Sequence, residues 1–177
     1  MTGDDRTLRF EQTFLPHLDA AHNLARWLAG NAQDAEEVVQ ESYLRAFEAF
    51  DSFRGQSPKA WLLAIVRNTC YSRLRRAGVR GEPAEFDEQM HTPEGTAGDP
   101  ESLALKAEDS RLLAGALEEL PEEYREAIVL RELEELSYKE IAAIAGVPIG
   151  TVMSRLARAR ERLHRSLTAA GARESRR

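Results

Sequence analysis

The 177-residue chain lacks several features that mark whole classes of protein. Its single cysteine, Cys70, excludes a disulfide within the chain and a cysteine-rich zinc site. No apolar run is long enough to cross a bilayer, and the N-terminus carries no hydrophobic segment typical of a signal peptide. We therefore expect a cytoplasmic protein without membrane insertion.

Catalytic motifs are lacking as well. The sequence contains no nucleophile motif and no glycine-rich phosphate loop. The histidines lie too far apart to suggest metal ligands: His17, His22, His91 and His164. We expect no catalytic residue, no metal and no cofactor, which makes an enzyme the weakest interpretation of this sequence.

Sustained strand alternation is also absent, and helical periodicity takes its place between residues 8 and 76. One apolar stripe contains Phe14, Leu18, Ala21, Ala25 and Leu28. A second contains Ala35, Val38, Val39, Tyr43, Ala46, Phe47 and Phe50. A third helix is expected from Pro58, with Ser57 as its N-cap, to about Arg76.

The middle of the chain differs in composition. Gly, Pro and acidic residues dominate positions 77–101, and helical periodicity returns from Leu112. We predict an all-α fold of two small helical domains, residues 1–76 and 109–177, joined by a flexible acidic linker over residues 77–108.

Charge is unevenly distributed beneath the net value of −6. Residues 1–53 carry a net −6 and residues 54–81 a net +7. Residues 82–136 carry a net −13 and residues 137–177 a net +6. Two basic segments, each preceded by an acidic one, suggest two nucleic-acid contacts; unevenly charged solvent-exposed faces are the simpler alternative.

The C-terminal basic segment has the pattern of a helix-turn-helix. Ser137 and Glu140 form a capping box, and Gly146 permits a left-handed turn before a second helix that begins near Pro148. That helix has a buried stripe of Val152, Leu156, Ala159 and Leu163. Its other face presents Thr151, Met153, Ser154, Arg155, Arg158, Arg160 and Arg162, which suit phosphates and base edges. A solvated face on a packing helix is the alternative.

The first basic segment mixes cations with aromatic residues, a combination that suits single-stranded nucleic acid. Its members are Phe50, Phe53, Arg54, Trp61, Arg67, Asn68, Tyr71, Arg73, Arg75 and Arg76. Taken singly, Phe53 and Trp61 are more often core residues than stacking platforms. Just before this segment, Glu37, Gln40, Glu41 and Leu44 line one helix face. An exposed leucine among acids is either an ordinary surface residue or part of a protein-binding patch.

These stretches together resemble the small extracytoplasmic-function group of bacterial RNA polymerase sigma factors, in the sigma-70 superfamily. The matching segments are DAEEVVQESYLRAF, FRGQSPKAWLLAIVRN and LPEEYREAIVLRELEELSYKEIAAIAGVPIGTVMSRLARARERL, in the family's order. The resemblance covers residues 8–76 and 112–168. It implies a subunit that joins core RNA polymerase, directs it to specific promoters and helps melt the minus-ten region.

The resemblance also implies roles for individual surfaces. Glu37, Gln40, Glu41 and Leu44 would dock on the clamp helices of the largest catalytic subunit, and the C-terminal domain would contact the polymerase flap. The minus-ten element would be bound by Phe50, Phe53, Arg54, Trp61, Arg67, Asn68 and Tyr71. The minus-thirty-five element would be read by Thr151, Ser154, Arg155, Arg158 and Arg160. An anti-sigma factor is a further expected partner.

Two positions depart from the family pattern. Met153 stands where many relatives have a polar or basic residue, and Ala157 where bulkier residues also occur. The alternative function is a helix-turn-helix transcriptional regulator that acts without being a polymerase subunit. A purely structural helical protein would leave the charge segments unexplained.

Overall fold

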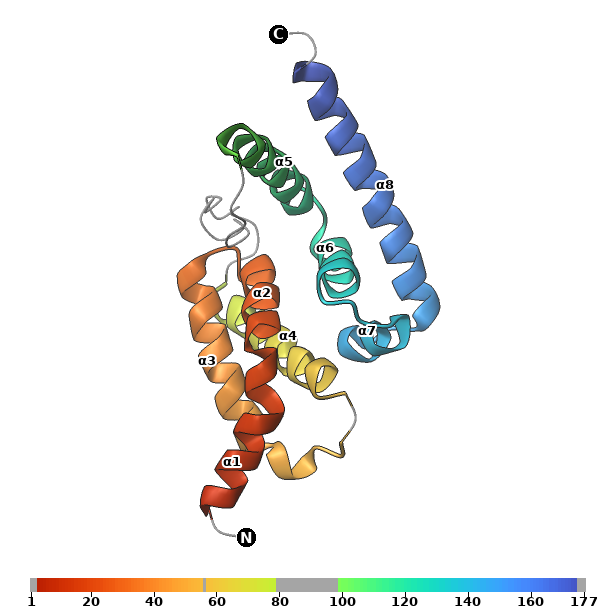
Figure 1. The fold of residues 1–177 in the computed structure, drawn as a ribbon. Helices are drawn as coiled ribbons and strands as arrows, with labels where there is room; N and C mark the ends of the chain where they lie inside the picture. The colour runs from red at the N-terminus through yellow and green to blue at the C-terminus, as the bar shows by residue number, and fades with distance from the viewer. Residues whose placement is uncertain (1–2, 56, 79–98, 175–177) are drawn as a thin grey trace.

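The computed structural model describes residues 3–55, 57–78 and 99–174, and every regular element in these ranges is a helix (Figure 1). The α-helices are α1 (Gly3–Phe14), α2 (Leu18–Ala29), α3 (Ala32–Glu48), α4 (Pro58–Arg76), α5 (Pro100–Glu118), α6 (Glu122–Ile128), α7 (Tyr138–Ala145) and α8 (Ile149–Glu174). Short 3-10 helices occupy Leu15–His17 (η1) and Phe50–Ser52 (η2), and a π-helix occupies Val129–Leu133 (η4). The predicted all-α class is confirmed. No single described helix is long and apolar enough to cross a membrane.

The N-terminal helices form a bundle in which α2, α3 and α4 pack on one another and α1 lies against α4. Both predicted stripes point inward: Phe14, Ala21, Ala25, Leu28, Ala35, Val38, Val39, Ala46 and Phe50 are buried. Leu18, Tyr43 and Phe47 are partly buried beside them. Each helix of the bundle buries one stripe, which is why periodicity alone identified these residues.

Local caps set the helix boundaries in this bundle. The Oγ of Ser57 accepts a hydrogen bond from the Ala60 amide at 3.2 Å, and Pro58 takes the first helical position, as predicted. The third helix ends at Arg76, where the sequence placed it. Asn31 caps α3 by accepting from the Asp34 amide at 2.8 Å.

The C-terminal helices begin earlier than the sequence indicated. Residues 100–108 belong to α5, so this part of the expected flexible linker is helical. Pro100 and Glu101 supply the proline and the acid of a normal first turn. The described side chains here, such as Leu105, are mostly exposed, so no buried stripe marked this helix in the sequence. The rest of the expected linker, residues 79–98, lies outside the described residues.

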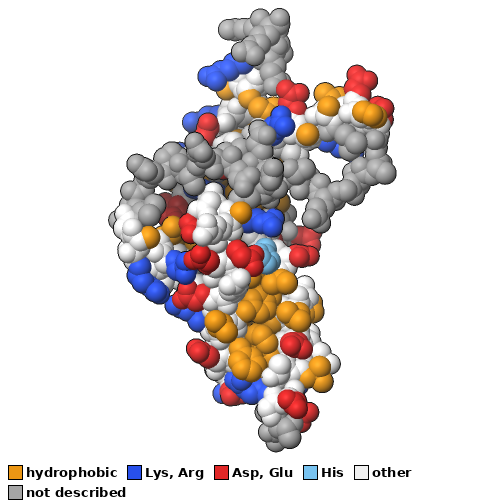
Figure 2. Space-filling view, turned by 90° about the vertical axis from the view of Figure 1, so that its left-hand side faces the viewer, with side chains coloured by type: hydrophobic (Ala, Val, Ile, Leu, Met, Phe, Trp, Pro, Cys, Tyr) orange, Lys and Arg blue, Asp and Glu red, His pale blue; other side chains and the backbone are white. Residues whose placement is uncertain are grey.

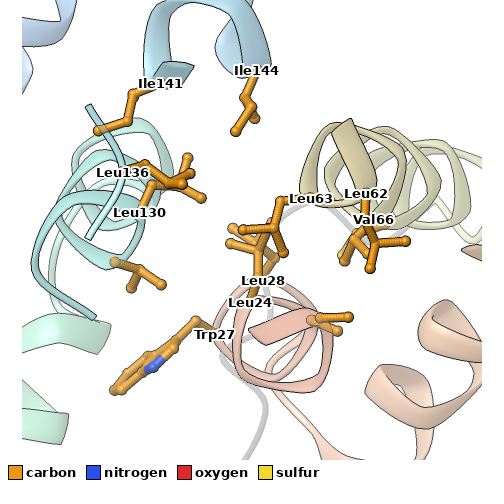
Figure 3. Packing of buried hydrophobic residues seen from close by; sticks show 14 of the residues in the cluster. Leu24, Trp27, Leu28, Leu62, Leu63, Val66, Leu130, Leu136, Ile141 and Ile144 are labelled. Carbon is orange, nitrogen blue, oxygen red and sulfur yellow. The ribbon is translucent and has the colours of Figure 1, made fainter. Parts of the chain in front are cut away.

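The two halves of the chain share one hydrophobic core. Helix α4 contacts α7, and α2 contacts α6. Leu24, Leu28 and Leu63 face Leu130 and Ile144 across this boundary, as the close view shows (Figure 3). Separating the halves would therefore expose apolar surface from both.

Two glycines near the turn between α7 and α8 offer a matched test of this backbone. A Cβ would meet no atom within 4 Å at Gly146 or at Gly150, but only Gly146 has a positive φ, of 68°. We expect Gly146→Ala to destabilise the fold by about 1–2 kcal/mol, because a left-handed residue with a Cβ is strained. Gly150→Ala, in a helix, should stabilise it by roughly 0.5 kcal/mol. Urea unfolding measures both, and shifts of the same sign would contradict the assigned turn.

Candidate nucleic-acid interface

Helices α7 and α8 form the predicted helix-turn-helix. The amide of Glu140 donates to Ser137 Oγ at 3.1 Å, and Glu140 Oε2 accepts from the Ser137 amide at 2.8 Å, which completes the capping box. Helix α7 ends at Gly146 in the left-handed conformation. The two helices are bent by 101° relative to each other, within the range of DNA-binding helix-turn-helix motifs.

One side of α8 holds the helix in place. Val152, Leu156 and Ala159 are at most 1% exposed, and Leu163 is partly buried. At about 100° per residue, this stripe leaves Ser154 on the opposite side. Helix α8 is thus anchored by its predicted stripe and presents its N-terminal turns outward.

The five residues expected to read the minus-thirty-five element are not equally available. Ser154 and Arg158 are exposed, and Thr151 is partly exposed beside them. Arg155 is partly buried and lines the cleft next to Glu126. Arg160 is ion-paired with Glu132 at 2.8 Å. The outward surface of the helix is therefore built around Ser154 and Arg158.

The expected minus-ten aromatics belong to an aromatic cluster in the N-terminal bundle. The Trp61 ring lies 5.1 Å from that of Phe14 and 5.3 Å from that of Phe53, measured between centroids. Phe50 is buried against Phe10 and Phe14. Phe53 and Trp61 are only partly buried, so each packs on the core and keeps part of its surface accessible.

Two residues of the expected minus-ten surface, Arg67 and Tyr71, are held by the C-terminal half. Glu126 of α6 is 2% exposed and accepts hydrogen bonds from Arg67 and, at 3.1 Å, from the Tyr71 hydroxyl. Burial first, and then the charge of Glu126, raises the pKa of Tyr71 far above its ordinary range, so the phenol stays a neutral donor. Asn68 and Arg54 remain exposed.

A second buried carboxylate joins the halves in the same way. Glu134, 6% exposed, forms an ion pair with Lys59 of α4 at 3.1 Å and accepts from Asn23 of α2 at 2.6 Å. The π-helix η4 leads into this residue, and the following Glu135 has a positive φ of 56°. This irregular backbone directs Glu134 toward the N-terminal bundle. Neither Glu126 nor Glu134 stands out in the sequence, since both lie in an acidic run typical of a solvent-exposed surface.

The expected polymerase-binding stripe lies on α3. Leu44 is 67% exposed and Gln40 is exposed, whereas Glu37 and Glu41 pair with Arg73 of α4. Burial alone would raise the pKa of Glu41, but its contacts with Arg73 and Arg45 lower it below the ordinary value. Hydrophobic side chains gather over the N-terminal bundle among charged ones (Figure 2). The exposed leucines of this bundle are Leu8, Leu15 and Leu44.

Comparison with known families supports the division of the chain into two parts. Residues 13–80 match the family model for sigma-70 region 2, and residues 110–163 match the model for sigma-70 region 4. The first match contains α2, α3 and α4, and the second contains the helix-turn-helix. Both matches occur in the order that the sequence motifs suggested.

Individual relatives and solved structures agree with these matches. The chain is 44% identical over 135 residues to the ECF RNA polymerase sigma-E factor of Escherichia coli K12, covering 72% of this chain and 71% of that protein. It is 37% identical over 169 residues to the ECF RNA polymerase sigma factor SigE of Mycolicibacterium smegmatis, covering 92% and 63%. The sigma factor RpoE of Bartonella quintana, solved with the anti-sigma factor NepR, superimposes with a TM-score of 0.73 at 33% identity, covering 90% of this chain and 97% of that one. CnrH, solved with the cytosolic domain of CnrY, gives a TM-score of 0.64 at 28% identity, covering 90% and 88%.

The buried Glu126 can be tested with a pair of isosteric variants. Glu126→Gln should release Arg67 and Tyr71, because a hydrogen bond to a charged group contributes about 1.5–3 kcal/mol. We expect the free chain to bind a labelled single-stranded DNA oligonucleotide on the order of tenfold more tightly, measured by fluorescence anisotropy. The control, Glu123→Gln, removes the same charge from an exposed position on the same helix. Equal effects of the two variants would show that only net charge matters.

Proposed function

The chain belongs to the extracytoplasmic-function group of sigma-70 family RNA polymerase sigma factors, and on that premise we propose which of its surfaces binds polymerase and which bind promoter DNA. A sigma factor binds core RNA polymerase and directs it to specific promoters. The polymerase supplies the chemistry of RNA synthesis, so we assign no reaction to this chain. The proposal concerns which residues make each contact.

We propose that the α3 stripe is the main contact with core polymerase. Its charge would repel DNA phosphates, whereas the exposed Leu44 offers an apolar anchor among acids. Glu37, Gln40, Glu41 and Leu44 would meet the clamp helices of the largest catalytic subunit. The C-terminal domain would meet the flap.

We propose that α8 reads the minus-thirty-five element in the major groove. Ser154 and Arg158 supply the base or phosphate contacts nearest the groove, with Thr151 beside them. Arg155 and Arg160 would contact the DNA once Arg155 leaves the cleft next to Glu126 and Arg160 leaves its ion pair with Glu132. The observation that carries this proposal is the outward face of α8, fixed by the buried stripe behind it.

The minus-ten element would be bound by the aromatic cluster and by α4. The residues are those expected from the sequence: Phe50, Phe53, Arg54, Trp61, Arg67, Asn68 and Tyr71. Partly exposed rings such as Phe53 and Trp61 provide stacking surfaces for unpaired bases. Buried Phe50 would support these rings from below, without touching DNA.

We propose that the described structure is a closed form with little affinity for promoters. Arg67 and Tyr71 cannot hold Glu126 and a DNA strand at once. Binding to polymerase would move helices α1 to α4 away from helices α5 to α8, using the segment between α4 and α5 as the linker. An anti-sigma factor, as found with the solved sigma factor RpoE, would control how much of the protein is free to bind polymerase. The protein would act in the cytoplasm, where polymerase and promoters are.

One observation separates this function from that of a regulator acting alone. A sigma factor needs polymerase for tight binding to promoters, whereas an independent regulator does not. Transcription from a library of random promoters, with core polymerase added, tests the proposal directly. Tight sequence-specific binding of duplex DNA by the chain alone at physiological salt would favour the regulator.

The polymerase contact makes a specific prediction. Leu44→Ala should weaken binding to core polymerase by more than tenfold, since an interface anchor contributes about 2 kcal/mol or more. Leu44 is already solvent-exposed, so the melting temperature should not change. Leu105→Ala is the matched control, because Leu105 is 60% exposed on α5 against 67% for Leu44 on α3. Equal affinity of both variants would refute the docking site.

The two DNA contacts can be separated by the template used. Arg158→Ala should reduce promoter binding on duplex and pre-melted templates alike, by about 1–3 kcal/mol if Arg158 contacts guanine. Asn68→Ala should impair the duplex template and spare one with an artificial bubble at minus ten. Asn68 is exposed, so its loss reports on DNA, whereas loss of Phe53 or Trp61 would also weaken the core. If the bubble fails to rescue Asn68→Ala, this side chain has no role in opening.

A further inference from the structure

The outward part of α8 has one apolar flank that the proposed contacts do not use. Ile149 is 45% exposed and Met153 is 53% exposed, and Ala157 is exposed one turn further along. Single exposed apolar residues are common on protein surfaces. Here three of them recur every four residues at the start of a DNA-reading helix, which makes them a continuous surface.

Helix geometry places this flank beside the polar contacts. At about 100° per residue, Met153 and Ala157 lie on one side of Ser154, and Thr151 and Arg158 lie on the other. The N-terminal turns of a recognition helix are those that reach base edges. In the strip Ile149–Met153–Ala157, here called the apolar flank, Met153 and Ala157 would therefore lie beside Ser154 in the groove, and Ile149 lies nearer the buried stripe.

Small residues on and beside the apolar flank would allow the helix backbone to approach the DNA closely. Gly150 is exposed and has no side chain, and Ala157 has only a methyl group. Met153 is then the one long side chain on this side of the first turns, with a flexible thioether that adapts to its partner. Glu161, exposed further along and paired with Arg165, places a carboxylate on the helix beyond this surface.

The chemistry of the groove offers one partner for such a surface. Base edges in the major groove carry hydrogen-bond donors and acceptors, apart from the C5-methyl group of thymine, which is apolar. We propose that Met153, flanked by Ile149 and Ala157, selects thymine in the minus-thirty-five element through contact with this methyl group. Arg158 on the other flank reads or clamps a neighbouring position. This inference rests on the proposed function and specifies its sequence preference.

Uracil substitution tests the proposal because it removes only the methyl group. Upstream sequences are first selected from random duplexes with the holoenzyme, and each selected thymine is then replaced by deoxyuridine. We expect one or two positions at which the wild-type holoenzyme loses about fourfold in affinity, the value of one buried methyl-sized group. Met153→Gln, similar in length but polar, should show no difference between thymine and uracil at that position. Met153→Leu should keep the difference.

The control variant and the outcomes separate this inference from the proposed function. Leu167→Gln changes an exposed apolar residue on the same helix, about 21 Å further along at 1.5 Å per residue, and should keep the wild-type response. The methyl contact would be overturned if holoenzyme binding to the selected upstream sequence required Arg158 but was unchanged by uracil at every position. That result would leave the proposed function intact. Failure to select any upstream sequence with the holoenzyme would overturn both.

Discussion

The two halves can pack on each other only if the carboxylates buried between them find partners, and Glu126 is the more deeply buried of the two. A carboxylate that is 2% exposed is costly to bury unless it is hydrogen-bonded and paired with a cation. Arg67 and Tyr71 of α4 provide those partners, so Glu126 ties α6 to α4. The apolar contacts around Leu63 and Leu130 then follow, and Glu134 repeats the arrangement with Lys59 and Asn23. Such buried pairs contribute little net stability, but removing one partner leaves a buried charge without compensation. They therefore favour two states, fully closed and fully open, over gradual opening.

Ion pairs of this kind also account for the alternating charge of the sequence. In this structure carboxylates pair with the arginines that DNA phosphates would otherwise contact. Acidic side chains pair with cations of both basic segments: Glu37 and Glu41 with Arg73, Glu126 with Arg67, and Glu132 with Arg160. A DNA phosphate approaching any of these arginines has to replace a carboxylate. The exposed pairs are weak and screened by salt, whereas the Arg67 pair is shielded from it. We therefore attribute most of the proposed control to Glu126 and not to the net charge of the acidic segments.

Much of the fold was predictable because local rules determine it. The capping box at Ser137, the glycine turn and the stripe of α8 were all predicted to the residue, since each depends on near neighbours in sequence. The start of α5 was missed because a mostly exposed helix leaves no apolar period. Glu126 was missed for a different reason. It lies in a run of acids with Glu122 and Glu123, and only the distant contact with Arg67 distinguishes it from them. The sequence thus proposes which residues form the candidate site, but it does not show that Arg67 and Tyr71 contact the other half of the chain.

The aromatic cluster shows why a core role and a DNA role need not exclude each other. A base can stack on a ring only if the ring is already held at the right angle and position, because ordering a free side chain costs entropy. Phe14 is fully buried and supports one side of Trp61 and Phe53, leaving part of each ring accessible. The packing that makes these rings resemble core residues in the sequence is therefore the same packing that would prepare them for an unpaired base. Because the bundle already holds the rings rigidly, capturing a base costs less side-chain entropy. More of the free energy of base stacking is then available for opening the duplex.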